Sequence, residues 1–298
     1  MARILITGSR GVVGTCLTKI LKERGHEVHG LDLAHSADKN YVRCDVSQYR
    51  QLEKVIEGFD FVYHAAAEFG RWNGEDYYEQ LWMTNAVGTK NIIRLQEKHR
   101  FKLIHFSSSE VYGDCGGVMR EDVMVKTAIQ QMNDYAMSKW VNEMQIRNSK
   151  IQFGTETTIV RLFNTYGPGE VYHPYRSVNS RFCYAALNGL PITVYQGHIR
   201  TSTYIEDACR TLANIVDNFT GDTYNIGGTR RHNIETMAQI IWDYTGADKS
   251  LITYKPSEIL TTKVKRTDVR KAIDDLGHKD TISLEDGIAK TIDWMRGQ

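Results

Sequence analysis

Residues 3–14 read RILITGSRGVVG, and this stretch decides the fold. Its first five residues form an apolar run typical of a buried strand, and three glycines follow with the spacing GxxGxxG. Glycines at such positions permit a tight turn and a close backbone approach to a pyrophosphate, and the first turn of a following helix supplies N–H groups. A lone glycine pattern is weak evidence, but here a strand precedes it and an amphipathic helix follows it. The stretch therefore predicts a dinucleotide-binding turn rather than an ordinary structural one.

Strand-type and helix-type segments alternate through the first 160 residues. Several strand-type runs are almost wholly apolar, as expected where helices cover both faces of a parallel sheet. The alternation predicts an α/β fold with a Rossmann-type, doubly wound parallel sheet. The expected strands are 3–7, 27–32, 40–44, 59–64, 102–106 and 157–162, and the expected helices are 12–24, 48–57, 76–99 and 133–148.

After residue 164 the alternation loosens, and residues 166–174 are rich in glycine, proline and aromatic side chains. We interpret this change as a crossover from a dinucleotide-binding domain, residues 1–164, into a smaller mixed α/β substrate-binding lobe, residues 165–298. More than one crossing between the two is compatible with the pattern. In the second part we expect strands at 192–195, 203–205, 222–226 and 251–254, and helices at 205–218, 233–245 and 284–295.

The composition is that of an ordinary globular protein. Of the 298 residues, 41% are apolar and 24% are charged, which suffices for a sizeable core. The net charge of +1 gives no reason to expect nucleic acid or an acidic membrane as a partner, and no apolar stretch has the length needed to span a bilayer. The five cysteines are scattered without a CxxC pair, so we expect reduced thiols in a cytoplasmic protein, with no disulfide framework and no metal site.

Acidic residues end two of the expected strands. Asp32 comes 18 residues after Gly14, close to the spacing of an acid that accepts hydrogen bonds from the ribose hydroxyls of a dinucleotide. A carboxylate there would repel a 2′-phosphate and favours NAD over NADP, whereas Arg10 in the turn is a contrary sign. Asp45 is suited either to bonding an adenine ring or to capping the helix expected at residue 48.

Tyr135 and Lys139 lie four residues apart within an expected helix, so their side chains share one face. A lysine in this position can lower the proton affinity of the tyrosine, which then takes a proton from an alcohol while a hydride leaves the alcohol carbon. The YxxxK pattern alone is common, and by itself it indicates no more than an exposed helix face. It gains weight here from the glycine-rich turn and from the three serines, 107–109, at the end of a strand.

Together these motifs resemble the NAD-dependent nucleotide-sugar epimerase/dehydratase family of extended short-chain dehydrogenases. The resemblance covers nearly the whole chain and includes SSSEVYG at 107–113, RLFNTYGPG at 161–169 and YNIGG at 224–228. It implies a tightly held NAD, a nucleoside-diphosphate sugar substrate, and a homodimer built on the helices 76–99 and 133–148. The residues that it implies in NAD binding are Gly8, Arg10, Gly11, Val12, Val13, Asp32, Asp45, Val46, Ala65, Ala66, Ala67, Asn85, Tyr135, Lys139 and Phe163.

The resemblance also assigns the reactive groups. Ser108 stands in the position of the family's catalytic serine or threonine, which bonds the sugar oxygen that becomes a carbonyl. Glu110 resembles the base that removes the C5 proton in 4,6-dehydratases and related decarboxylases, and its alternative is a solvated turn carboxylate. Ser109 stands where many 4,6-dehydratases carry an aspartate, which leaves the reaction open, and for Ser107 we expect a structural role at the strand end. The implied catalytic residues are Ser108, Glu110, Tyr135 and Lys139.

Substrate contacts are implied mainly for the second half of the chain. The resemblance brings Ser108, Ser109 and Asn164 to the sugar, and it assigns Arg200 and Arg266 to the diphosphate, whose oxygens suit guanidinium groups. The remaining basic residues near Arg266 are expected on a solvated surface, and residues 224–225 are expected to border the nucleotide. Residues 68–82, a longer stretch than the family usually has, are expected either to form a substrate lid or to pack as the start of a helix. The basic residues concerned are Lys263, Lys265, Arg270 and Lys271.

The main hypothesis is an enzyme that oxidises C4 of a nucleotide sugar transiently, as a 4,6-dehydratase or a 4-epimerase. Decarboxylation of a nucleotide-sugar uronate is an alternative. It is less favoured because no positively charged residue can be assigned clearly to the C6 carboxylate, although Arg71 and Arg176 are candidates for that role. A net oxidoreductase is a second alternative, with slight support from Arg10. A non-catalytic NAD-binding protein is the third, and the complete set of serine, tyrosine and lysine argues against it.

Overall fold

The computed structural model describes residues 1–257 and 260–298. Seven parallel strands form the central sheet, which confirms the expected Rossmann-type fold. The order reverses between β1 and β4, and crevices at such switch points are where open α/β sheets bind ligands. From one edge to the other the strands are β12 (Thr223–Ile226), β7 (Thr157–Leu162), β5 (Lys102–Ser108), β4 (Phe61–His64), β1 (Arg3–Thr7), β2 (Glu27–Asp32) and β3 (Tyr41–Arg43).

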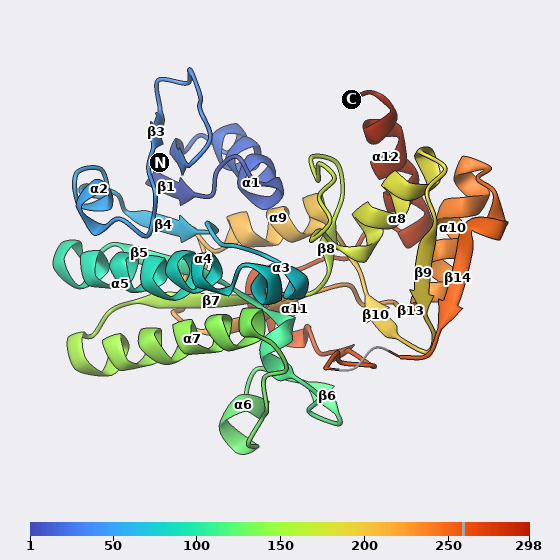
Figure 1. Ribbon diagram of the computed structural model, residues 1–298. Helices are drawn as coiled ribbons and strands as arrows, with labels where there is room; N and C mark the ends of the chain where they lie inside the picture. Colours follow the sequence, from blue (N-terminus) through green and yellow to red (C-terminus); the bar gives the residue numbers. More distant parts are fainter. Residues whose placement is uncertain (258–259) are drawn as a thin grey trace.

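Helices cover both faces of this sheet (Figure 1). Each face has its own buried core, as the nearly continuous apolar strands require. On one face lie α1 (Val12–Glu23), α9 (Ile205–Asn214) and α11 (Arg270–Leu276), and on the other α2 (Tyr49–Glu53), α5 (Gly88–His99) and α7 (Asp134–Phe153). None of the helices in the described residues is long and apolar enough to cross a membrane.

The second lobe lies beside the sheet and shares its core. Trp242, Ile288 and Ile292 are buried in one cluster with Ile4 and Leu17 of the Rossmann part. The helices of this lobe are α8 (Val178–Leu187), α10 (Ile234–Thr245) and α12 (Leu284–Arg296). Its two-stranded sheets pair β9 (Ile192–Tyr195) with β14 (Ile252–Lys255), and β10 (Ile199–Thr201) with β13 (Arg231–Asn233).

Short elements tie the two lobes together. β8 (Thr165–Tyr166) pairs with β11 (Thr203–Tyr204), and β6 (Val118–Met119) pairs with β15 (Arg266–Thr267). The second pair joins an excursion of the Rossmann part, which also carries α6 (Val123–Lys126), to residues far along the chain. Two short 3₁₀ helices, Ser109–Tyr112 and Lys249–Leu251, complete the architecture.

The helix expected over 76–99 is wrong as a single element. The structure divides it into α3 (Arg71–Asp76), α4 (Tyr78–Trp82), a π-helical turn (Met83–Val87) and α5, and the break follows from the non-helical backbone of Tyr77 (φ −135°, ψ 51°). The helix expected over 48–57 is shorter, at Tyr49–Glu53, whereas α7 runs five residues beyond its expected end, to Gly154 in the left-handed region.

The strand expected at 222–226 joins the central sheet, where β12 pairs with β7. Likewise, α9 packs against α1 rather than inside the second lobe. The chain therefore returns to the Rossmann sheet after entering the second lobe, and the boundary at residue 164 stays a prediction. The sequence pattern gave no sign of α8 or α11.

Candidate active site

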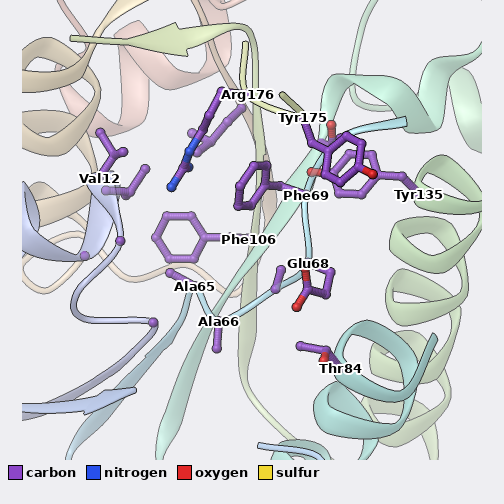
Figure 2. A pocket seen from close by; sticks show the side chains of 18 of the residues that line it. Val12, Ala65, Ala66, Glu68, Phe69, Thr84, Phe106, Tyr135, Tyr175 and Arg176 are labelled. Carbon is purple, nitrogen blue, oxygen red and sulfur yellow. The ribbon is translucent and has the colours of Figure 1, made fainter. Parts of the chain in front are cut away.

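A cavity of about 730 Å³ lies at the ends of the parallel strands, above the point where the strand order reverses. Residues from both lobes line it, from the glycine-rich turn to Ser177 and Arg181 of the second lobe. Val12 and Tyr135 face the cavity from opposite sides, with Phe106 of β5 between them (Figure 2).

The glycine-rich turn exposes bare backbone to this cavity. Gly8 has φ +71°, and a Cβ on it would lie 2.6 Å from the backbone nitrogen of Ala66. A Cβ on Gly14 would overlap the carbonyl oxygen of Gly8 and lie 2.7 Å from Cα of Ser9. The turn thus needs glycine at both positions, and it leaves room for a pyrophosphate against the start of α1.

Asp32 lies at the end of β2 with its carboxylate held in place by the backbone. It accepts hydrogen bonds from the N–H groups of Arg10 (2.9 Å), Leu33 (2.7 Å) and Ala34 (3.3 Å). Arg10 takes part in these bonds through its backbone and its side chain is exposed, so the carboxylate lies at the cavity wall in a position that suits ribose hydroxyls.

Asp45 and Val46 also line the cavity, as do Ala65, Ala66 and Ala67. The helix-capping alternative for Asp45 is wrong, because the N-cap of α2 is Gln48. The Asp45 carboxylate instead accepts a hydrogen bond from Ser47 N at 2.8 Å.

The helix α7 begins at Asp134, one residue before Tyr135. Asn133 caps α7 by accepting a hydrogen bond from Ala136 N at 2.9 Å, which fixes the start of the helix. Lys139 lies with Nζ 5.8 Å from the centre of the Tyr135 ring and donates to the carbonyl of Phe106 at 2.9 Å. The two residues and Ser108 therefore meet where β5 ends.

Burial governs the protonation of this pair. It lowers the pKa of Lys139 to about 8 and raises the pKa of Tyr135 to about 12, a rise that a hydrogen bond with Ser108 opposes and the charge of Glu110 reinforces. Desolvation thus outweighs the hydrogen bond from Ser108, and the expected effect of Lys139 on the proton affinity of the tyrosine stays a prediction.

The three serines have three different partners. Ser107 Oγ donates to Glu143 Oε1 at 2.6 Å, in line with the structural role expected for it. Ser108 Oγ accepts from the backbone N–H of Glu110 at 3.2 Å and lies at the cavity. Ser109 Oγ accepts from Nζ of Lys265 at 3.0 Å. Only the middle serine is thus placed beside the tyrosine.

A buried network fixes the strand that carries these serines. Arg161 of β7 donates to both carboxylate oxygens of Glu143 on α7, at 2.9 and 2.7 Å, and both side chains are fully buried. Arg161 also donates to Tyr112 Oη at 2.7 Å, and that hydroxyl donates to Asn225 Oδ1 of β12 at 2.7 Å. Glu143 follows Lys139 by four residues, a spacing that could have drawn attention to it in the sequence.

Glu110 forms an ion pair with Lys265, whose side chain is only 2% exposed. The expectation that Lys265 lies on a solvated surface is therefore wrong, whereas the Glu110 side chain is 29% exposed and its solvated alternative stays a prediction. Burial acts to raise the pKa of Glu110, but the Lys265 ammonium, together with Arg200 and Arg71, outweighs it, and the pKa is lowered. The carboxylate is consequently ionised at neutral pH and lines the cavity close to Ser108.

Comparison with known proteins identifies the family. The model of the NAD dependent epimerase/dehydratase family matches residues 4–227. The chain belongs to this family. One relative, the UDP-N-acetyl-alpha-D-glucosaminuronate decarboxylase of Bacillus cytotoxicus, is 30% identical over 314 residues, which cover 99% of this chain and 98% of that protein.

The dTDP-glucose 4,6-dehydratase of Neisseria meningitidis is 29% identical, with 99% of this chain and 93% of that protein covered. Among solved structures, epimerase Mth375 of Methanothermobacter thermautotrophicus superimposes with a TM-score of 0.91 at 25% identity, over 99% of this chain and 92% of that one. The epimerase/dehydratase family thus contains relatives of three reaction types, and its members use NAD as this chain does.

The cavity fits this cofactor. The bare turn at Gly8 and Gly14 accommodates a diphosphate, and the carboxylate of Asp32 suits the adenosine ribose of NAD. The chain is therefore an NAD-dependent enzyme of the epimerase/dehydratase family. Clusters of histidine, cysteine and acidic side chains that would suit a metal ion do not occur in the described ranges, and the five cysteines are free thiols.

Two residues that the family resemblance assigned to NAD do not line the cavity within the described chain. Asn85 is buried and ties the loop after β4 to α7: its side chain bonds the backbone N–H and carbonyl of Glu68, at 2.8 and 3.0 Å, and Ser138 Oγ at 3.1 Å. Phe163 is fully buried against Tyr112. Both support the cavity from behind.

Of the residues that the resemblance assigned to the substrate, some line the cavity and others do not. Asn164 lines the cavity and donates to the Thr201 carbonyl at 3.0 Å, and Ser109 lines it as well. Arg200 lines a second cavity of about 540 Å³, which adjoins the first at Trp72, Arg181 and Thr261. Arg266 is exposed on β15 and lines neither cavity of the described residues.

Residues 69–72 belong to the wall of the cavity. The guanidinium of Arg176 lies 4.0 Å from the centre of the Phe69 ring, and Figure 2 draws both side chains at the cavity. Tyr175 Oη donates to Asp76 Oδ2 at 2.5 Å, which ties α3 to the second lobe. This segment therefore both lines the site and packs on a neighbour, so the two expectations for it are compatible.

Proposed function

We propose that this enzyme oxidises C4 of a nucleoside-diphosphate hexose transiently, either as a 4,6-dehydratase, which then acts on C5 and C6, or as a 4-epimerase, which reduces the ketone again on its other face. One observation carries the proposal: Ser108, Tyr135 and Glu110 line a single cavity together with the glycine-rich turn. An alcohol, a proton acceptor, a carboxylate base and a dinucleotide can therefore meet there.

In the first step Tyr135 and Ser108 hold the C4 hydroxyl, and its proton passes to Tyr135 Oη as the C4–H bond breaks. NAD, when bound, would take up the hydride from C4 and would return it to C6 of the dehydrated sugar, with a proton added at C5, or to C4 of the turned ketone in an epimerase. Lys139, whose pKa is lowered to about 8 by burial, provides an ammonium next to the tyrosine, and this positive charge stabilises the phenolate form against the burial that raises the tyrosine pKa.

In the second step the ionised Glu110 acts beside the new ketone. The C5 proton is acidic because the electron pair left at C5 delocalises onto the C4 oxygen, so a carboxylate can remove it. In a dehydratase the C6 hydroxyl then departs with a proton as water. An epimerase needs no such step, because its ketone turns over and is reduced on the other face.

A second candidate is decarboxylation of a nucleoside-diphosphate hexuronate. From the sequence it was less favoured because no cation could be assigned clearly to the C6 carboxylate, but Arg71 and Arg176 both line the cavity. Loss of CO₂ from C5 of a 4-keto uronate leaves its electron pair in the same delocalised form, so the first step would be shared. The similarity to the Bacillus cytotoxicus decarboxylase supports this candidate further.

One experiment separates these reactions. The purified enzyme is incubated with UDP-, dTDP-, GDP- and CDP-hexoses and with the corresponding hexuronates, and the products are followed by mass spectrometry. Loss of one water identifies a dehydratase, an unchanged mass with a new retention time identifies an epimerase, and loss of CO₂ identifies a decarboxylase. Net formation of NADH would identify an oxidoreductase, and no product from any sugar would refute the proposal.

We further propose that the enzyme is a cytoplasmic homodimer. Apolar side chains on the π-helical turn and on α7 are two-fifths exposed, as expected for a surface that pairs with its copy: Met83, Val87, Met137 and Met144. Light scattering on the purified protein tests the dimer, and a monomer at micromolar concentration would refute it. The five free thiols suit the reducing cytoplasm.

A further inference from the structure

We propose that Lys265 is a positioning residue of this active site, whose ammonium holds Glu110 and Ser109 for the proton transfer next to the ketone. The proposal deepens the function given above and rests on it, because it requires Glu110 to be the base. Lys265 would act through these two residues and not on the sugar itself.

The geometry singles out this lysine. Its Nζ donates to Ser109 Oγ at 3.0 Å and to Oε1 of Glu110, and both acceptors line the cavity. Lys265 is not among the lining residues of the described chain, and its side chain is 2% exposed. The ammonium therefore reaches the two residues from behind the cavity wall.

The backbone around Lys265 is fixed on both sides. Its N–H donates to the Ile199 carbonyl at 3.1 Å, and Thr262 Oγ1 donates to the Gly113 carbonyl at 2.7 Å. The next residues form β15, which pairs with β6. A segment bound to both lobes in this way presents the ammonium at one place, so Glu110 cannot turn away from the cavity without leaving a buried charge unpaired.

A buried ammonium is costly unless it is paired, and a merely structural tie between lobes would serve equally well with two apolar side chains. What an apolar pair could not do is keep a base charged beside the reacting carbon. This difference gives a readout that separates a positioning role from a structural one.

Several charged and titratable groups face Glu110. Lys265 is its ion-pair partner, Arg200 on β10 and Arg71 on α3 add positive charge, and Tyr135 approaches from α7. The pKa of Glu110 is lowered although burial acts to raise it, and the Lys265 ammonium is the largest opposing influence. Without that ammonium, burial would dominate, the pKa would rise, and the carboxylate would be protonated over a wider range of acidic pH.

The test compares Lys265→Met, Lys265→Gln and Lys265→Arg in the full-length holoenzyme, with the sugar nucleotide that the panel above identifies. Two readouts are needed: the transient NADH absorbance at 340 nm, which reports C4 oxidation, and product formation as a function of pH. Lys263→Met is the matched control, because Lys263 is an exposed lysine of the same segment.

For Lys265→Met and Lys265→Gln we expect product formation at pH 7 to fall at least about tenfold. The pH at which activity is lost on the acidic side of the profile, the acid limb, should rise by about one pH unit or more. The amplitude of the transient NADH absorbance should stay within about twofold of the wild type. Lys265→Arg should restore most of the activity and the original acid limb, and Lys263→Met should behave as the wild type. If Lys265→Met fails to fold, the same measurements on Lys265→Gln, which keeps a polar group at this position, test the proposal.

A folded Lys265→Met or Lys265→Gln with the wild-type pH profile would overturn the proposal. An equal loss of the NADH transient and of product would overturn the proposal as well, because the lysine would then affect C4 oxidation as much as the later proton transfer. Failure of the proposed function looks different, since the wild type itself would then give neither a transient nor a product with any sugar.

Discussion

Replacing Glu143 by leucine tests how the fold holds the catalytic strand against the catalytic helix. The change removes the carboxylate that accepts hydrogen bonds from Ser107 Oγ and from Nε and Nη2 of Arg161. The guanidinium would then keep only Tyr112 Oη, at 2.7 Å, and the Glu121 carbonyl, at 3.2 Å, as partners of Nη1. Its charge would remain fully buried without a counter-charge in hydrogen-bond contact.

Breaking a buried ion pair on one side costs about 3–5 kcal/mol. A single domain typically has about 5–15 kcal/mol of stability, so we expect a loss of about a fifth or more of the total. For a protein of this size the loss corresponds to a fall in melting temperature of roughly 5–8 °C. Urea unfolding followed by tryptophan fluorescence, together with calorimetry, measures both quantities.

Two further variants make the test decisive. In Glu143→Leu/Arg161→Met both charges are gone, so the double variant should recover much of the loss. Glu53→Gln breaks an exposed pair with Lys98, which solvent screens, and should leave the stability nearly unchanged. A loss below about 1 kcal/mol in Glu143→Leu, or a double variant as unstable as the sum of the single changes, would refute the account of this network.

Three other outcomes follow from the site. Tyr135→Phe removes the acceptor for the alcohol proton and should lower kcat by about 10²–10⁴-fold with little change in sugar-nucleotide Kd; residual activity above a tenth would contradict its role. Asp32→Ala removes the acceptor of three backbone N–H groups and the partner expected for the ribose. Titration calorimetry should therefore show that NAD binds about tenfold or more weakly, and that the affinity for NADP falls less. Because the pKa of Lys139 is lowered to about 8, its ammonium is present below that pH and lost above it, so activity should fall as the pH rises through about 8. Lys139→Arg, which stays charged, should move that fall to higher pH, and an unchanged alkaline limb would exclude Lys139 as its origin.

The sequence predicted the parts of this molecule that depend on neighbours along the chain. The glycine-rich turn, Asp32 at the end of its strand and the Tyr135–Lys139 pair each lie within one supersecondary unit, where spacing alone determines which groups meet. All of them reach the cavity. The family resemblance added Ser108 and Glu110, which reach it as well.

The features that the sequence did not predict are long-range or irregular. Glu110 and Lys265 are 155 residues apart, and nothing in the spacing of the basic residues 263–271 indicates which of them is buried. Arg266 was the residue favoured in that cluster, yet it is exposed on β15, one position beyond the buried lysine, because successive residues of a strand point to opposite sides. Periodicity also could not reveal the break at Tyr77, since residues 71–99 are helical on both sides of it.

The return of the chain to the central sheet has a consequence for how the protein is made. The edge of β7 is completed by residues 223–226, which leave the ribosome only after much of the second lobe has been synthesised. A nascent chain that stops at residue 164 would present the free backbone groups of β7 to other molecules, a template for aggregation. Dividing the gene at that point should therefore yield insoluble halves, whereas expressing the halves together, so that one lends its strand to the other, offers a route to a reassembled enzyme.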